Sequence, residues 1–282
     1  MPEELLAGGL DCSLLDVRWQ LGRSDGRAAY DAGHLPGAAY VDLEADLADP
    51  AGSRGRHPLP DPARFGEAMR RCGVRRARPV VVYDDVGGSS AARAWWLLRF
   101  HGHPDVRVLD GGWSWWQRLG GPVDHGAVQP AYGDFEPDPG RLPVLDADAA
   151  GRMGSVGVLI DARAPERFRG EVEPIDPVAG HIRGAVNVPA AQNLVAHGPR
   201  AGRFKSVEAL RATYAAALDR ARDRDAGHDS GGTGGVGVYC GSGVTAAHDA
   251  LALDLLGVEA AVYAGSWSEW VTDPRRPVAT GD

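Results

Sequence analysis

The sequence predicts an α/β protein made of two copies of one domain, each copy a mainly parallel sheet flanked by helices. Two observations lead to this fold class. Four short blocks from the first half of the chain recur in the second half, in the same order and at nearly the same spacing. In both halves, short valine-rich segments of strand length alternate with segments of helical character. Repeated alternation of this kind predicts a tandem duplication of the fold.

The repeated blocks pair one by one along the chain. "LLDVRW" pairs with "VLIDARA", "AGHLPGAAYV" with "AGHIRGAVNV", "VVVYD" with "VGVYC", and "VLDGGWSWW" with "VYAGSWSEW". We therefore expect an N-terminal domain over residues 1–120 and a C-terminal domain over residues 145–282. Residues 121–144 are rich in proline and glycine and lack apolar periodicity, which is typical of a linker. His34 and His181 occupy equivalent positions, so we expect them to share one structural hydrogen bond.

The individual elements follow from local composition. In the second copy, "SVGVLIDAR" and "GVGVYC" predict strands because they are valine-rich and bounded by glycine. The segment from Thr245 has apolar residues at Ala247, Leu251 and Leu255 and then reaches Gly257, which predicts a helix with a glycine stop. The polar segment 221–235 predicts a surface loop.

Composition and charge exclude several classes of protein. The net charge of −8 argues against broad binding to nucleic acid or to an anionic membrane. No apolar run approaches the roughly 18 residues of a membrane span, and the acidic start lacks the features of a signal peptide. The three cysteines form no CxxC pair, which argues against a disulfide scaffold or a zinc site. We expect a cytoplasmic protein without a metal.

One cysteine lies in a setting that favours chemistry. Cys240 ends a predicted strand, at the sheet edge where open α/β proteins bind ligands. Glycine permits the positive φ angles that would turn backbone N–H groups toward one point, and a helix N-terminus adds further donors. Such a loop stabilises a thiolate, or an anion attached to it. The alternative is a small buried cysteine followed by a glycine turn. The expected cradle consists of Gly241, Ser242, Gly243, Val244 and Thr245.

The first copy differs at the equivalent position. It has Asp84, followed by "DVGGSS", where the second copy has Cys240. An aspartate cannot accept a sulfur atom. We therefore expect the first copy to be catalytically silent and the second to be active.

These blocks together resemble the two-domain rhodanese family of sulfurtransferases. The likeness covers nearly the whole chain, through "HLPGAAYVDL", "LDGGW", "RFRGEVEPID", "GHIRGA", "CGSGVT" and "GSWSEW". It implies two rhodanese folds, no cofactor, and a Cys240 persulfide that carries sulfur from a small anionic donor to an acceptor. The acceptor would be cyanide or a thiol, with thioredoxin as one candidate.

The same resemblance bears on the donor. The loop Cys-Gly-Ser-Gly-Val-Thr resembles that of 3-mercaptopyruvate sulfurtransferases, so 3-mercaptopyruvate is the expected donor. The alternative functions are a thiosulfate sulfurtransferase and a non-catalytic sulfur-carrier module. Arg167 matches the arginine that holds the donor's anionic end; the alternative is an ion pair with a neighbouring glutamate. Ile175 stands where a second arginine is usual, and Arg183 replaces a commoner proline, as in the thiosulfate branch.

The resemblance also implies a proton relay. Ser242 matches its serine, His57 its histidine and Glu44 its acid, with Asp42 as the competing acid. Histidine suits proton transfer near neutral pH. His248, on the helix after the cysteine, is expected to point away from the thiolate and to be structural or exposed.

A cysteine phosphatase or arsenate reductase is the rival enzyme class. These enzymes also place a cysteine in a strand–loop–helix, but they need an arginine at the far end of the loop to bind a tetrahedral oxyanion. Residues 244–247, Val-Thr-Ala-Ala, supply none. We therefore favour sulfur transfer.

Overall fold

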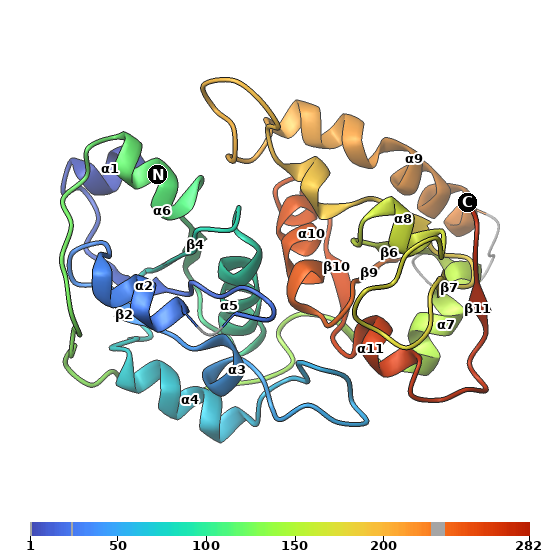
Figure 1. Cartoon of the computed structure of the whole chain (residues 1–282), viewed down its shortest axis with the longest axis horizontal. Helices are drawn as coiled ribbons and strands as arrows, with labels where there is room; N and C mark the ends of the chain where they lie inside the picture. The colour runs from blue at the N-terminus through green and yellow to red at the C-terminus, as the bar shows by residue number, and fades with distance from the viewer. Residues whose placement is uncertain (1, 24, 227–234) are drawn as a thin grey trace. The chain divides into compact units, whose positions relative to one another are not determined.

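The computed structural model describes residues 2–23, 25–226 and 235–282. The chain forms two compact units (Figure 1). The first consists of Met1–Asp49 and Leu59–Leu142, and the second of Pro50–Pro58 and Pro143–Asp282. Residues 50–58 therefore belong to the second unit, although they lie within the expected N-terminal domain.

The first unit is built on a four-stranded parallel sheet in the order β2-β1-β3-β4. Its strands are β1 (Ser13–Asp16), β2 (Ala39–Tyr40), β3 (Val80–Tyr83) and β4 (Val106–Val108). Its helices are α1 (Pro2–Leu6), α2 (Gly26–Ala32), α3 (Leu43–Asp46), α4 (Pro62–Arg71), α5 (Ser89–Phe100) and α6 (Gly112–Arg118).

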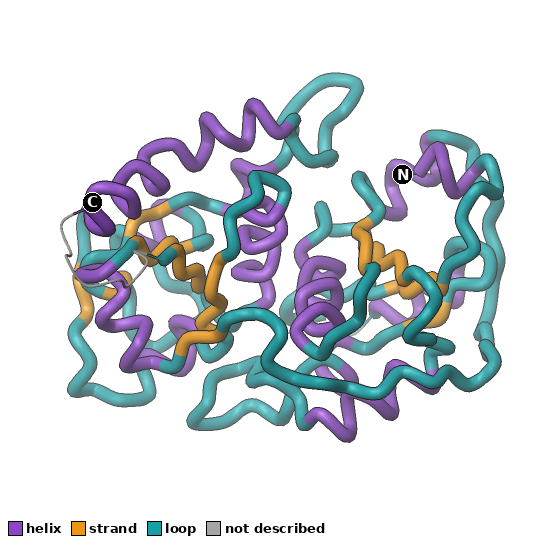
Figure 2. The backbone as a smooth tube through the Cα atoms, turned by 180° about the vertical axis from the view of Figure 1, so that it is seen from behind, coloured by secondary structure: helices purple, strands orange, loops and turns teal. Residues whose placement is uncertain are grey.

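The second unit contains a five-stranded parallel sheet in the order β5-β10-β9-β6-β8, with helices on both sides (Figure 2). Its strands are β5 (Val144–Leu145), β6 (Val158–Asp161), β8 (Val186–Asn187), β9 (Val236–Tyr239) and β10 (Ala260–Tyr263). A small antiparallel pair joins β7 (His181–Ile182) to β11 (Val278–Ala279). The helices are α7 (Ala147–Val156), α8 (Pro165–Phe168), the 3₁₀ turn η1 (Ala190–Asn193), α9 (Val207–Ala226), α10 (Val244–Asp254) and α11 (Ser266–Trp270).

The two sheets repeat the same topology, which confirms the predicted duplicated α/β fold. The order β2-β1-β3-β4 of the first unit corresponds to β8-β6-β9-β10 of the second. Local contacts repeat as well. The buried pair Arg18–Asp16 and the buried pair Arg163–Asp161 each join at 2.7 Å. Since a buried charge needs a partner, both copies depend on the same pair.

The equivalent histidines share the expected structural hydrogen bond. The Nδ1 atom of His34 lies 2.9 Å from the carbonyl oxygen of Tyr30, and that of His181 lies 2.8 Å from the carbonyl oxygen of Phe168. Each histidine ring also stacks on the aromatic ring of the residue that it bonds. These contacts brace both copies in the same way.

The central strand of the second unit and the helix after it form the core that supports the cysteine. All four residues of β9 are buried, as expected for a parallel strand covered on both faces. The predicted helix from Thr245 is α10, and Gly257 lies beyond its end with φ 74°. Nine of its residues are buried, from Val244 to Leu253, so α10 is an internal helix.

The predicted surface loop over residues 221–235 is wrong in its first part. Residues 221–226 continue α9, because alanine and arginine are strong helix formers that outweigh the polar composition. Residues 227–234 lie outside the described residues. No helix in the described ranges is long and apolar enough to cross a membrane.

Candidate active site

Cys240 lies directly after β9 and three residues before the end of a tight loop that opens α10. Its side chain is buried, and its Sγ accepts a hydrogen bond from the backbone N–H of Gly243 at 3.1 Å. Gly243 has φ 80°, and a Cβ there would collide with the carbonyl oxygen of Ala264. Only glycine fits this turn, which aims an N–H group at the sulfur.

Residues at the start of α11 hold the backbone of Cys240 through hydrogen bonds. The N–H of Cys240 donates to Ser266 Oγ at 3.1 Å, and its carbonyl oxygen accepts from the N–H of Trp267 at 3.0 Å. Ser266 is the one non-glycine residue with positive φ in the part of the chain that the structure describes, at 55°. Its hydroxyl also donates to the carbonyl oxygen of Tyr263 at 2.8 Å. A strained residue therefore holds the backbone of Cys240 in place.

His57 and Ser242 are brought together beside the cysteine. A hydrogen bond of 2.8 Å joins His57 Nδ1 to Ser242 Oγ, and both side chains are buried. His57 is carried by the segment 50–58, which packs with the second unit. The two groups are therefore placed to exchange a proton next to Cys240.

The two candidate acids lie in the first unit, where both have partners. Glu44 is exposed and accepts from Trp19 Nε1 at 3.2 Å. Asp42 is the N-cap of α3 and accepts from the N–H groups of Glu44 at 2.9 Å and Ala45 at 3.0 Å. The Asp42 carboxylate thus stabilises the start of that helix.

Arg167, on α8, borders the cysteine loop. A Cβ built on Gly241 would lie 3.6 and 3.7 Å from its two terminal nitrogens. The guanidinium donates to Glu173 at 3.1 and 2.6 Å and to Asp176 at 3.2 Å. Arg167 therefore both forms the ion pair with a neighbouring glutamate that the sequence suggested as an alternative and lies beside the cysteine loop. Burial raises the pKa of Glu173, but hydrogen bonds from Arg167 and from the amides of Asp176 and Ile175 outweigh it and hold the pKa below its usual value.

A second arginine at the loop escaped the sequence analysis. Arg56 Nη2 would lie 3.0 Å from a Cβ on Gly241, closer than Arg167. The only signal was its place next to His57 in "GRHPLP", which does not reveal where the segment packs. Ile175, at the expected position of a second arginine, is 42% exposed, and Arg183 is exposed beside α7.

The equivalent loop of the first copy holds a carboxyl group of its own. The Asp84 carboxylate accepts four backbone N–H groups at 2.8–3.0 Å, from Val86, Gly88, Ser90 and Ala91. Two of these donors lie in the first turn of α5. Burial raises the pKa of Asp84, and the backbone amides act against that rise. A loop of this construction therefore provides a buried carboxyl group with four backbone N–H donors.

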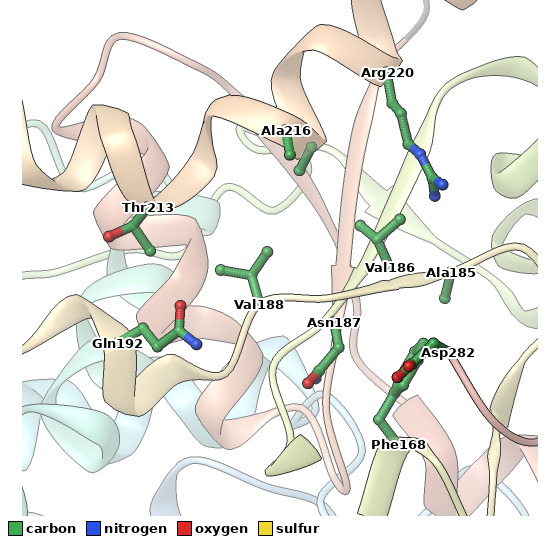
Figure 3. Close-up of a pocket in the computed structure, with 11 residues that line it drawn as sticks. Phe168, Ala185, Val186, Asn187, Val188, Gln192, Thr213, Ala216, Arg220 and Asp282 are labelled. Atoms are coloured by element: carbon green, nitrogen blue, oxygen red, sulfur yellow. The ribbon is translucent and has the colours of Figure 1, made fainter.

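Two other features lie outside this site. His248 is buried, and its Nδ1 accepts a hydrogen bond from Asn193 Nδ2 at 3.1 Å, so it is structural, one of the two roles expected for it. A pocket of about 450 Å³ is lined by residues of β8, α9 and neighbouring segments, and by none of residues 240–245 (Figure 3). Among the described residues, no group of three or more His, Cys, Asp or Glu side chains could hold a metal ion.

Comparison with known proteins identifies the family. The model of the rhodanese-like domain matches residues 2–119 and again residues 146–273. The chain belongs to the rhodanese-like family. The two matches coincide with the two copies seen in the repeats and in the sheets, so both halves are rhodanese domains.

Several relatives match over nearly the full length. A Mycobacterium tuberculosis protein, provisionally named thiosulfate sulfurtransferase, is 47% identical over 98% of this chain and 94% of its own. The human 3-mercaptopyruvate sulfurtransferase is 37% identical over 93% of this chain and 86% of its own. These relatives confirm the predicted enzyme class, a sulfurtransferase. Their names divide between two donors.

Solved structures agree on the fold. The crystal structure of a 3-mercaptopyruvate sulfurtransferase from Escherichia coli superimposes with a TM-score of 0.74 at 34% identity, covering 91% of this chain and 93% of the other. The enzyme of that name from Leishmania major gives 0.81 at 28% identity, covering 98% and 74%. The rhodanese-like fold family therefore extends over both domains of this chain.

Proposed function

We propose that this chain transfers a sulfane sulfur from 3-mercaptopyruvate to a thiol or to cyanide through a persulfide on Cys240. In this proposal the domain over residues 145–282, together with the segment that carries His57, is catalytic. The domain over residues 1–120 is silent because Asp84 replaces the nucleophile. The observation that supports it most is the 3.1 Å hydrogen bond from the N–H of Gly243 to Cys240 Sγ at the start of α10.

The first half-reaction loads the cysteine. The Cys240 thiolate attacks the donor's sulfur, an S–S bond forms, and the donor's C–S bond breaks with its electron pair on carbon. The leaving group is the enolate of pyruvate, which gains a proton while the donor's thiol loses one. The products are pyruvate and the anionic persulfide Cys–S–S⁻. The two electrons that sulfur loses are gained by the donor's carbon, so no other oxidant or reductant is needed.

The second half-reaction unloads it. A thiolate or cyanide attacks the outer sulfur, and the S–S bond breaks to return the Cys240 thiolate. The acceptor leaves as a persulfide or as thiocyanate. Two separate half-reactions predict ping-pong kinetics.

Backbone N–H groups stabilise the persulfide in this proposal. The Asp84 carboxyl group of the first copy is the model for this arrangement. Its two oxygens lie two bonds from Cβ and accept four backbone N–H groups. The outer sulfur of a Cys240 persulfide would also lie two bonds from Cβ. The donors would be the N–H groups of Gly241, Gly243, Val244 and Thr245. Such preorganised donors need no rearrangement as charge develops.

Ser242 and His57 supply the proton to the enolate. Their 2.8 Å hydrogen bond provides a path between the loop and an imidazole ring, which can both accept and donate a proton. Glu44 stays the predicted acid of the relay, with Asp42 as its competitor. Arg167 holds the donor's carboxylate, since a guanidinium binds that group with two parallel hydrogen bonds.

Thiosulfate is the second candidate donor, and one observation favours it. Two guanidinium groups border Gly241, and a compact dianion rewards positive charge near the attacked sulfur. Against it, the two residues after the cysteine, Gly241 and Ser242, carry no charge.

A side-by-side measurement of kcat/KM for the two donors, with cyanide as acceptor, tests the proposal. We expect 3-mercaptopyruvate to be the better donor. Exchanging the loop residues, Gly241→Arg with Ser242→Lys, should raise turnover with thiosulfate and lower it with 3-mercaptopyruvate. If the wild-type enzyme has a higher kcat/KM with thiosulfate than with 3-mercaptopyruvate, the proposed donor is wrong and thiosulfate takes its place.

A further inference from the structure

We propose that Arg56 is a second guanidinium of the donor site, which binds the anionic end of the donor together with Arg167, and that Asp176 positions both. The inference rests on the proposed function for the identity of the donor. The ligand chemistry is an oxyanion group, either the carboxylate of 3-mercaptopyruvate or the oxygens of thiosulfate.

The segment that carries Arg56 is fixed on the second unit. Gly52 and Gly55 exchange backbone hydrogen bonds of 3.0 Å, which closes a tight turn before Arg56. A Cβ on Gly55 would lie 2.6 Å from the carbonyl oxygen of Gly265, so this turn packs closely against the residue before α11. The N–H of Arg56 donates to Ser268 Oγ at 3.1 Å. Its position therefore follows the same helix that anchors Cys240.

Each guanidinium has one side bound to acid and another turned to the loop. Arg56 Nη1 pairs with Asp176, while Arg56 Nη2 lies nearest Gly241, 3.0 Å from the position of a Cβ. The buried Nε of Arg56 has no hydrogen-bond partner. Arg167 uses Nε and Nη2 for Glu173 and Asp176, while its Nη1 lies 3.6 Å from the same Cβ position. Polar atoms of both arginines thus remain available beside the residue that follows the nucleophile.

Asp176 joins the two arginines. One of its oxygens pairs with Arg56 and the other with Arg167 at 3.2 Å, and its side chain is only 3% exposed. A carboxylate between two guanidinium groups offsets their mutual repulsion and holds them side by side. Buried charges are tolerated only with such partners, so Asp176 is a positioning residue for both.

Arg56 also accounts for the missing arginine in the second copy. Ile175 occupies the expected place, its side chain is 42% exposed, and its N–H is bound to Glu173. A second guanidinium instead reaches the loop from residues 50–58, far away in the sequence. The donor's anion can then be held at two points although the loop itself carries no charge.

The experiment compares two alkylating reagents of nearly equal size, anionic iodoacetate and neutral iodoacetamide, on the full-length chain. The rate of modification at Cys240 is measured for each by mass spectrometry, and the ratio of the two rates reports attraction of an anion. Arg56→Met should lower this ratio by roughly 10-fold, and Arg56→Lys, which keeps the charge but loses the fork, should lower it less. Thermal melting verifies that each variant is folded. If Arg56→Met does not fold, the ratio measured for Arg56→Lys tests the proposal instead.

Two matched controls accompany the variants. Arg54 is exposed in the same turn, and Arg54→Met should leave the ratio unchanged. The ratio at Cys12, a partly exposed cysteine of the first unit, should not change in any variant. Asp176→Asn should lower the ratio at Cys240 and raise the KM for the anionic donor more than it lowers kcat, since it displaces both arginines.

The outcomes separate this inference from the proposed function. A lower ratio in the Arg56 variants, with a donor KM raised roughly 10- to 100-fold, supports both. A lower ratio in a chain that transfers no sulfur supports the anion site and removes the proposed function. An unchanged ratio and an unchanged donor KM in both Arg56 variants overturn the role of Arg56.

Discussion

The loop after β3 and the loop after β9 share one construction and differ in what occupies it. In the first, the Asp84 side chain supplies two oxygens that take four backbone N–H groups. In the second, the Cys240 side chain ends in one sulfur, which accepts from Gly243. The Asp84 carboxyl group thus takes up four donors of its own loop. In the proposed reaction, the outer sulfur of a Cys240 persulfide would lie one atom beyond Sγ and take up the equivalent donors. On the proposed mechanism, the second loop therefore resembles the first only when Cys240 carries a second sulfur atom.

The loops also differ in length. The N–H group that closes the first loop belongs to Gly88, four residues after Asp84, and the one in the second loop belongs to Gly243, three residues after Cys240. Both glycines have positive φ, 94° and 80° respectively, and both are the N-caps of the following helices. The shorter loop brings the helix N-terminus closer in sequence to Cys240, and the partial positive charge of a helix N-terminus favours an anion such as the proposed persulfide.

The largest expected effect comes from breaking the second loop with Gly243→Ala. The new Cβ would collide with the carbonyl oxygen of Ala264, at a φ that alanine adopts at a cost of about 1–2 kcal/mol. We expect the free energy of unfolding in urea to fall by about 3 kcal/mol or more. Sulfur transfer should fall at least about 100-fold, because one donor no longer points at the sulfur.

Gly257→Ala is the matched control for that change. Gly257 also has positive φ, 74°, but a Cβ there meets nothing within 4 Å. Its substitution should cost only about 1 kcal/mol and leave sulfur transfer unchanged. Equal losses of activity in the two variants would mean that the turn at Gly243 has no special role at the sulfur.

A smaller effect is expected from opening the first loop with Asp84→Ala. The variant leaves four backbone N–H groups without their acceptor, so the free energy of unfolding should fall by about 2–3 kcal/mol. Sulfur transfer should stay within about 2-fold of wild type, because the chemistry belongs to the other copy. Formate should raise the melting temperature of this variant more than that of wild type, since it can occupy the emptied cradle. A large loss of activity in a folded Asp84→Ala chain would contradict the silent role of the first copy.

The sequence predicts features that depend on neighbouring residues and on the repeat. The cysteine loop can be predicted from the sequence because a strand, glycines and a helix follow one another within a few residues of Cys240. His34 and His181 are readable as structural because the same position recurs in both copies. The equivalence of Asp84 and Cys240 follows from the same alignment of the two halves, and the silence of the first copy stays a prediction.

Features that depend on distant packing are not readable in this way. Arg56 reaches the loop only because Gly55 packs against Gly265, a contact between segments far apart in the chain. Asp176 pairs with two arginines, one nearby and one from residues 50–58. The sequence suggested only an ion pair of Arg167 with a neighbouring glutamate. The strained backbone of Ser266 is equally hidden, since a serine in "GSW" gives no indication of a positive φ.

The mass of the chain after exposure to donor alone tests the central claim most directly. The full-length protein is incubated with 3-mercaptopyruvate in the absence of an acceptor, digested without reduction, and its cysteine peptides are weighed, with Cys240→Ser treated in parallel. The account predicts that the Cys240 peptide gains the mass of one sulfur atom, that cyanide removes it, and that Cys240→Ser gains none while it melts like wild type. Added sulfur on Cys12 or Cys72, or no added sulfur on any peptide, would contradict it.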